Sequence, residues 1–479
     1  MSVHEAGYFV ARPDSHINTY GTKSVSFRFR GRSYNFALSH GLFSSADIDT
    51  GSRFLLKVFS DALDEDIKNG KPLPHRILDA GSGVGVLGIC AAGAIRAAET
   101  PESLLVKEAE KSSLHVRAQD RDELARIFTE YNARQNSLGP ETLGAWTEPL
   151  LAGPGGWDLI LSNIPAKAGL PVLEDFVRRS AALLNAEGRV FLVAVNTLSD
   201  FFDSAIQANS SLIIREKGPG HTVFMYARKE RKSETSFPFL TKDDFFIQCP
   251  GYIRRRNEYE IEKTSYHLDT IHGAPGFDSP GDEILVAAKL VVRLKEEILS
   301  CFRSENKKNE AVKAESPESP VLIWEGSQGH FSSWFAAHFR SAWGIILAER
   351  NILSLVLSRY NTAIALKDLK TKSSVQIVCA ADLYLDREKI LGEAEKAIPG
   401  TGSRGFPFIA AFPEFIPQVD IIESLWEGFA ALASPQGIVL TGFSSAEAER
   451  FDRKKPKDFS RLGDLRKKGF RALAYKKTL

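Results

Sequence analysis

The sequence has little of what marks a secreted, membrane or metal-binding protein. Its 479 residues include only four cysteines, scattered without a Cys-x-x-Cys pair, which favours free thiols in a reducing compartment. The ten histidines show no metal-ligand spacing, so we expect no metal. No run reaches the roughly 20 apolar residues of a membrane helix, and the first residues contain no apolar signal core. These absences predict a soluble cytoplasmic protein without a membrane partner.

Net charge is also nearly absent. The chain has 61 Lys and Arg residues against 60 acidic residues, so its composition carries no general nucleic-acid signal. Any basic surface must therefore be local. What the chain does have is apolar content: 43% of the residues are hydrophobic and 10% aromatic. At this length such a chain can bury two or three cores, so we expect more than one domain.

A glycine-rich turn at residues 76–88 is the most informative local pattern. Two apolar residues and Asp79 are followed by three alternating glycines, Gly81, Gly83 and Gly85, and then by a run of small residues. We predict a buried parallel strand, a tight turn and a helix. Glycines at such a turn let a cofactor approach the backbone amides and the helix N-terminus. The glycine spacing alone also fits a dinucleotide site or a purely structural turn.

Polar residues follow the next predicted strands as well. Asp120 and Arg121 come directly after a strand predicted at 114–119, where a carboxylate can accept hydrogen bonds from both ribose hydroxyls. Asp120 lies 35 residues after Gly85, further than the roughly 20 residues of the dinucleotide pattern. A third predicted strand, over 143–150, brings three residues to the region that commonly touches adenine: Trp146, Thr147 and Glu148.

Two further motifs point to one family. Upstream of the glycine turn, Phe43-Ser is followed by Asp49-Thr-Gly-Ser-Arg53, in which Asp49 or Thr50 can cap a helix. Downstream, an apolar strand from Trp157 breaks into Asn163-Ile-Pro-Ala-Lys-Ala-Gly169. With the acidic residue two positions before the first glycine, these motifs resemble the small-domain class I S-adenosylmethionine (SAM) methyltransferases, typified by ribosomal RNA guanine-N2 methyltransferases and their archaeal relatives.

The resemblance implies a cofactor and a site. In this family the segment that contains Phe43 covers the SAM pocket. The residues that would hold SAM are therefore Phe43, Asp79, Gly81, Gly83, Gly85, Asp120, Arg121, Thr147 and Asn163.

The resemblance also assigns the chemistry to Asn163 and Pro165. In relatives that methylate an exocyclic amine or amide, the Asn side-chain oxygen and a backbone carbonyl accept hydrogen bonds from the target NH2. These bonds aim the nitrogen lone pair at the sulfonium methyl, so no strong base is needed. Two positions depart from the family pattern. Ile164 replaces a proline, and Ala166 replaces an aromatic whose stacking is worth about 1–3 kcal/mol per base. Lys167 is placed to meet a phosphate.

The chain then repeats itself. Ser33-Tyr34 and His40-Gly41 recur 232 residues later as Ser265-Tyr266 and His272-Gly273. Asp120-Arg121 and Tyr131-Asn132 recur 229 residues later as Glu349-Arg350 and Tyr360-Asn361. We therefore predict an α/β protein with two Rossmann-like methyltransferase domains in tandem, each a mostly parallel sheet with an antiparallel last strand. The predicted domains span residues 1–235 and 236–479, with a mobile insertion at about 303–320.

The second copy is predicted to be degenerate. Aligning Gly81 with Gly326 puts Trp324, Gln328 and His330 at the positions of Asp79, Gly83 and Gly85. Aligning Pro165 with Pro413 puts Ala411 at the position of Asn163. Basic clusters on this half form either solvated faces or a surface for an RNA backbone: Arg254–Arg256, Arg453–Lys457 and Arg466–Lys468.

The sequence thus predicts an enzyme, a SAM-dependent N-methyltransferase whose first-choice acceptor is an exocyclic guanine amine in RNA, such as ribosomal RNA. Two alternatives stay open. The acceptor can be a protein amide or another small amine, as the missing aromatic at Ala166 suggests. The protein can also be a binding module that keeps a SAM pocket without turnover. Oligomeric state has no signal in the sequence.

Overall fold

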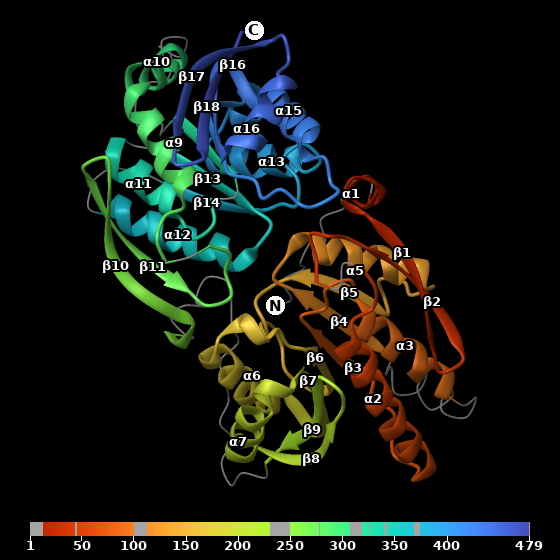
Figure 1. The fold of residues 1–479 in the computed structure, drawn as a ribbon. Helices are drawn as coiled ribbons and strands as arrows, with labels where there is room; N and C mark the ends of the chain where they lie inside the picture. The colour runs from red at the N-terminus through yellow and green to blue at the C-terminus, as the bar shows by residue number, and fades with distance from the viewer. Residues whose placement is uncertain are drawn as a thin grey trace.

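The computed structural model of the protein describes residues 13–43, 46–99, 113–229, 250–276, 278–306, 319–324, 326–339, 343–367 and 374–478. It contains two α/β halves, each built on a seven-stranded sheet (Figure 1). The predicted fold class is therefore confirmed. Residues 230–249, which include the predicted domain boundary, and most of the expected insertion at 303–320 lie outside the described residues. The domain boundary at 235/236 remains a prediction. Among the described helices, none is both long and apolar enough to cross a bilayer.

The sheet of the first half has the strand order β5-β4-β3-β6-β7-β9-β8. Its strands β5, β4, β3, β6 and β7 pair in parallel, and β9 runs antiparallel between β7 and β8, as predicted for the last strand. The elements are α1 (Pro13–Tyr20), β1 (Lys23–Phe29), β2 (Arg32–Leu38), α2 (Thr50–Lys68), β3 (Arg76–Ala80), α3 (Val86–Ala98), β4 (His115–Asp120), α5 (Glu123–Gln135), β5 (Leu143–Thr147), β6 (Trp157–Asn163), η1 (Ala166–Ala168), α6 (Leu170–Ala182), β7 (Leu184–Val195), η2 (Asn196–Leu198), α7 (Ser199–Asn209), β8 (Ser210–Lys217) and β9 (His221–Arg228).

The second half repeats this order as β14-β13-β12-β15-β16-β18-β17, again with an antiparallel β18 between β16 and β17. Its elements are η3 (Pro250–Tyr252), β10 (Ile253–Ile261), β11 (Thr264–Ile271), α9 (Asp282–Arg293), α10 (Lys295–Asn306), β12 (Ser319–Trp324), α11 (His330–Phe339), β13 (Trp343–Glu349), α12 (Ile352–Lys367), β14 (Ser374–Cys379), α13 (Arg387–Ala397), α14 (Thr401–Arg404), β15 (Phe406–Ala411), α15 (Ile421–Leu432), β16 (Ala433–Ser444), α16 (Ser445–Arg453), β17 (Phe459–Lys467) and β18 (Phe470–Lys477).

Small corrections to the predicted elements have local causes. The sequence predicts a helix over residues 121–136. The helix begins at Glu123, because the Asp122 side chain caps it by accepting a hydrogen bond from the Leu124 amide. The sequence also predicts a helix over residues 170–185. This helix ends at Ala182, because β7 already begins at Leu184. The strand expected over 143–150 ends at Thr147.

Each half carries a two-stranded hairpin ahead of its sheet, β1–β2 in one and β10–β11 in the other. In Figure 1 the hairpins lie on opposite outer sides of the molecule. The same device holds each of them. The Asn132 side chain bonds both the N–H and the C=O of Ala37, and the Asn361 side chain bonds both those of Asp269. The asparagines of the Tyr-Asn pairs from which the repeat is inferred therefore make the same hydrogen bonds in both halves.

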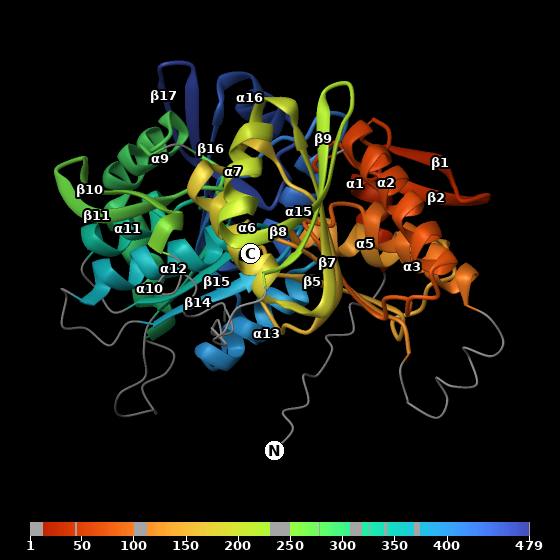
Figure 2. The ribbon, with the colours of Figure 1, turned by 90° about the horizontal axis from the view of Figure 1, so that it is seen from below.

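The two halves meet through equivalent loops. The Glu123 amide donates to the Arg350 carbonyl at 2.9 Å, and the Ile352 amide donates to the Arg121 carbonyl at 2.8 Å. These two bonds flank an antiparallel bridge between Asp122 and Asn351. The arrangement is that of a pseudo-twofold interface, in which each half offers the same segment to the other. Figure 2 shows the two halves side by side.

Candidate active site

The glycine turn lies where β3 ends and α3 begins, in the middle of the first sheet. Gly81, Gly83 and Gly85 all have positive φ angles, of 80°, 56° and 87°. Residues other than glycine rarely adopt this left-handed backbone conformation, which explains the alternating glycines. The turn is tied to the neighbouring strand, because the amides of Gly81 and Ser82 both donate to the Gln119 carbonyl.

The glycines divide into two kinds. A Cβ atom added to Gly85 would lie 3.0 Å from Ile89 and Thr129, so this glycine is needed for packing. A Cβ on Gly83 would meet nothing within 4 Å, and one on Gly81 only the Leu150 side chain at 3.7 Å. Gly81 and Gly83 therefore face open space, as a turn that lets a cofactor approach the backbone requires.

Asp79 is fully buried at the end of β3. One carboxylate oxygen accepts a hydrogen bond from the Gly88 amide at 2.8 Å, and the other has no partner among the described residues. Burial, with Asp120 nearby, raises the pKa of Asp79 to about 7. Gly88 itself is tightly packed, since a Cβ there would lie 3.0 Å from the carboxylate. The last glycine of the motif, Gly88, thus packs against Asp79 and donates a hydrogen bond to it, whereas Gly81 and Gly83 face open space.

Asp120 lies at the carboxyl end of β4, next to the same turn. Its two oxygens accept hydrogen bonds from the amides of Gly83, at 2.9 Å, and Asp122, at 3.1 Å. A carboxylate has about four acceptor positions, so the group retains capacity for ribose hydroxyls. Burial raises the pKa of Asp120 above its ordinary value, which the two amide hydrogen bonds and Arg121 oppose.

Asn163 ends β6, the strand beside β3. Its side-chain Nδ2 donates to Asp49 Oδ2 at 2.7 Å and to Ser52 Oγ at 3.0 Å. Asp49 is the N-cap of α2, as predicted, and the same Oδ2 accepts from the Ser52 amide at 3.1 Å. The upstream motif and the Asn163 motif are thus in direct contact, through the hydrogen bonds of Asn163 with Asp49 and Ser52. The sequence reasoning located both motifs but missed this contact, because the residues lie 114 apart in the chain.

The remaining predicted residues lie less directly at the turn. The Arg121 side chain donates to the Gly273 carbonyl of the second half, and the Thr147 hydroxyl donates to the Glu123 carboxylate. Phe43 is 61% exposed, and Pro165 is exposed in the loop after β6. The cofactor contacts of all the predicted residues, including Phe43, Arg121 and Thr147, remain predictions. The catalytic roles of Asn163 and Pro165 do so as well.

The second half borders the segment that follows β6. A Cβ on Gly169, at the end of the Asn163 loop, would lie 2.6 Å from His272 Nδ1, so the His272 ring lies directly against this glycine. Behind the cofactor region, Lys389 of the second half donates to Glu123 at 3.0 Å. Arg126 and Lys389 overcome the effect of burial and lower the pKa of Glu123 to about 2.

The corresponding turn of the second half needs a corrected alignment. In the sheets, Ala80 pairs with Gln119, and Trp324 pairs with Ala348, the equivalent of Gln119. Trp324 therefore corresponds to Ala80, and the predicted alignment is wrong by one residue. Structural equivalence instead pairs Asp79 with Ile323, Gly83 with Ser327, Gly85 with Gly329 and Asn163 with Phe412.

Backbone geometry supports the corrected alignment. Ser327 has a φ of 51° and Gly329 of 92°, close to 56° and 87° at Gly83 and Gly85. Thr129 bonds the Gly83 carbonyl just as Ser358 bonds that of Ser327. The second half therefore keeps the shape of the turn. The second half lacks the buried carboxylate of Asp79 and the side-chain amide of Asn163, because Ile323 and Phe412 stand at these positions.

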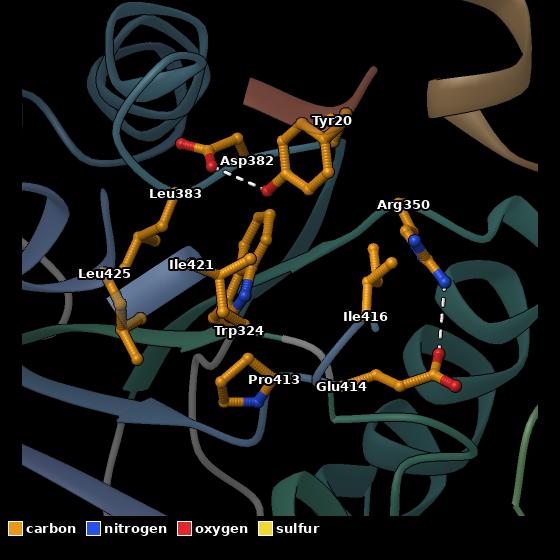
Figure 3. Close-up of a pocket in the computed structure, with 11 residues that line it drawn as sticks. Tyr20, Trp324, Arg350, Asp382, Leu383, Pro413, Glu414, Ile416, Ile421 and Leu425 are labelled. Atoms are coloured by element: carbon orange, nitrogen blue, oxygen red, sulfur yellow. Dashed lines mark hydrogen bonds and ion pairs between the residues drawn. The ribbon is translucent and has the colours of Figure 1, made fainter. Parts of the chain in front are cut away.

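The edge of the second sheet next to this turn is filled by side chains (Figure 3). Trp324 lies in the middle, and Tyr20 reaches in from the first half to donate to Asp382 Oδ2 at 2.7 Å. The space left between them is about 20 Å³, room for about one water molecule. No nucleoside fits there.

Comparison with known proteins agrees with this geometry. Residues 33–203 match the family model of the methyltransferase small domain. A Bacillus subtilis (strain 168) protein described as uncharacterized, YbxB, is 26% identical over 230 residues, covering 46% of this chain and 96% of that protein. Among solved structures, the T. thermophilus 16S rRNA N2 G1207 methyltransferase RsmC, in complex with AdoMet and guanosine, matches with a TM-score of 0.53 at 15% identity. That match covers 95% of this chain and 98% of the other.

A seven-stranded sheet with an antiparallel β9, a glycine turn after β3 and a polar loop after β6 define the class I methyltransferase fold. Within the first half, residues 33–203 match the methyltransferase small domain, and the protein is a SAM-dependent methyltransferase. The residues present fit SAM. Two acidic side chains, the buried Asp79 and the partly exposed Asp120, lie beside the open glycines. The positive charge of SAM would favour their ionised forms, whereas a pyrophosphate would repel them. SAM supplies the electrophilic methyl group, and Gly81, Gly83 and Asp120 would hold it.

Proposed function

We propose that this protein transfers the SAM methyl group to an exocyclic guanine amine in RNA, with ribosomal RNA as the first substrate to test. One observation carries the proposal. The Asn163 side chain lies one strand from the open glycine turn, with its Nδ2 group bound by Asp49 and Ser52. The Asn163 oxygen has no partner among the described residues, and an amine donor is its natural complement.

The chemistry then requires placement rather than a strong base. An amine held by the Asn163 oxygen and a loop carbonyl presents its lone pair to the methyl group and releases its proton after the bond has formed. Such placement converts a bimolecular reaction into an effectively unimolecular one, which alone can lower the barrier by about 7–11 kcal/mol. The start of α2 lies on one side of Asn163, and His272 lies against Gly169 at the end of the following segment.

Two observations support an RNA acceptor. The similar T. thermophilus structure, which covers both halves, is that of an rRNA guanine methyltransferase with guanosine bound. The loop that carries Asn163 also exposes Lys167, a cation suited to a phosphate backbone.

One observation favours a second candidate. Ala166 is exposed in the loop and supplies no aromatic surface for a base. A protein amide or small amine, which needs no stacking partner, is therefore the alternative acceptor.

Incubation with labelled SAM and separate RNA and protein fractions tests the proposal. We expect label in ribosomal RNA, recovered as N2-methylguanosine after digestion. Label confined to protein would replace the RNA acceptor with the amide alternative. Stoichiometric SAM binding without transfer to either fraction would support a binding module without turnover.

A further inference from the structure

We propose that Asp49 is a positioning residue that locks the Asn163 side-chain amide in one orientation, so that only its oxygen faces the acceptor. This inference rests on the proposed function, because it concerns how the same site selects an amine. Asp49 reaches neither cofactor nor acceptor in this assignment. It acts through Asn163.

The lock follows from the chemistry of the two groups. An Asn side chain has a donor end and an acceptor end of nearly equal size, and nothing in its shape decides which end faces a ligand. Asp49 is an acceptor-only carboxylate, and its Oδ2 lies 2.7 Å from Asn163 Nδ2. Turning the amide over would bring two acceptor oxygens together. The amide nitrogen must therefore point at α2 and the oxygen away from it.

Ser52 completes the arrangement. Its hydroxyl lies 3.0 Å from Asn163 Nδ2, and its own amide donates to the same Asp49 oxygen at 3.1 Å. Both Nδ2 hydrogens thus have acceptors, and the Asp49 carboxylate is itself held by the first turn of α2. Preorganisation of this kind lowers the reorganisation needed in the transition state.

Close packing at Gly51 fixes the carboxylate further. A Cβ on Gly51 would lie 2.8 Å from Asp49 Oδ2 and 3.1 Å from the His221 ring. The missing side chain therefore allows β9 and the cap of α2 to approach one another. The start of α2 is built around this contact and not only around helix capping.

The second half provides an internal comparison. The Leu285 amide donates to the Gly281 carbonyl as the Arg53 amide donates to that of Asp49, which makes Gly281 the equivalent cap residue. Gly281 has no side chain to offer, and Phe412 stands where Asn163 would be. The half without the amide also lacks its lock. A carboxylate at the cap position is not required to begin such a helix, since the cap residue of α9 is a glycine.

Two substitutions separate the lock from the cap. Asp49→Ser keeps a hydroxyl that can cap α2 but is too short to reach Asn163. We expect its turnover at saturating SAM to fall about 10- to 100-fold, as expected for lost preorganisation, while SAM affinity stays within threefold of wild type. Asp49→Asn keeps an oxygen that can accept both N–H groups, and we expect it to restore turnover to within about threefold. Asp420→Ser, which alters an aspartate cap at the start of α15 in the second half, is the control.

A second measurement needs no acceptor. The Asn163 side-chain NH2 resonance in an NMR spectrum, identified by its loss in Asn163→Ala, should be protected from exchange in wild type and in Asp49→Asn and exposed in Asp49→Ser. Wild-type protection or wild-type turnover in Asp49→Ser would overturn the inference. If wild-type protein methylates no RNA, the proposed acceptor fails, and the NMR comparison still decides whether Asp49 locks the amide.

Discussion

The two halves of this protein share one sheet order but differ at the carboxyl edge of that sheet. In the first half, Asp79 and Asn163 end adjacent strands beside glycines that face open space. In the second, Ile323 and Phe412 hold the same positions, and Tyr20 and Trp324 fill the nearby space. The backbone of the turn is kept even so, with Ser327 in the left-handed conformation of Gly83. The turn is thus a structural element that both halves share, and we attribute the candidate cofactor site of the first half to its polar side chains and open space.

The largest expected effect tests the acceptor side of this difference. Asn163→Ala removes the amide that the second half lacks. We expect methyl transfer to fall by about 100- to 1000-fold, the usual effect of removing one preorganised group, with little change in SAM affinity. Asn185→Ala, which removes an amide bonded to Gly156 and Asp158 elsewhere in the sheet, should leave transfer unchanged. Rates of transfer from labelled SAM to RNA measure both variants. Unchanged transfer in Asn163→Ala would remove its assigned role.

The next test replaces the buried carboxylate. Because burial raises the folded-state pKa of Asp79 to about 7, the folded state favours the neutral form. The stability that this gives is fully present below the unfolded pKa of about 4 and is lost as the pH rises through 7. The loss is at most about 4 kcal/mol. Urea unfolding without SAM should therefore show wild type losing stability over this range relative to Asp79→Asn. If the free energy of unfolding changed with pH in the same way in both proteins, the raised pKa of Asp79 would be contradicted.

A smaller effect on SAM binding is expected when Gly83 of the first half is replaced by serine, the residue at the equivalent position of the second half. Gly83→Ser copies Ser327, and its side chain would enter the open space at the turn. We expect SAM to bind about 10-fold or more weakly by calorimetry. Gly70→Ser is a matched control, because Gly70 has a similar φ of 66° and open surroundings. Both changes should cost about 1–2 kcal/mol of stability through backbone strain. A loss of SAM affinity that is equal in the two variants would attribute the effect to strain.

The reverse substitution should change least. Ser327→Gly relieves a strained backbone worth about 1–2 kcal/mol but removes the Ser327 hydrogen bond to the Pro275 carbonyl at 2.9 Å, worth about 0.5–1.5 kcal/mol. We expect a change in the free energy of unfolding of no more than about 1 kcal/mol. The second half should still bind no SAM, since Trp324 and Tyr20 occupy the space. If Ser327→Gly gained a second SAM site, the difference in SAM binding between the two halves would depend on this one glycine alone.

Local patterns predicted most of the fold. The cap at Asp49, the small-residue helix after the glycine turn and the strand that ends in Asn163 lie where the sequence places them. Caps, small-residue helices and apolar strands have short-range signals. The one-residue shift in the second half escaped detection for a physical reason. Gly326 provided the alignment anchor, whereas the strained residue of that turn is Ser327, whose positive φ no sequence pattern indicates.

Contacts between distant residues were also out of reach. Nothing near Asp49 signals that its carboxylate binds Asn163, and nothing near Lys389 signals an ion pair with Glu123. Both depend on where the sheet and the interface between the halves place the side chains. The residues of the candidate site were thus predictable as members of motifs, while the interactions that orient them required the fold.

The central claim is that one chain holds one SAM, in its first half. Equilibrium dialysis of the full-length protein against labelled SAM tests it most directly. We expect saturation at one SAM per chain, without competition from NAD. Saturation at two SAM molecules per chain would contradict this account of the second half, and displacement of SAM by NAD would contradict the assignment of the glycine turn.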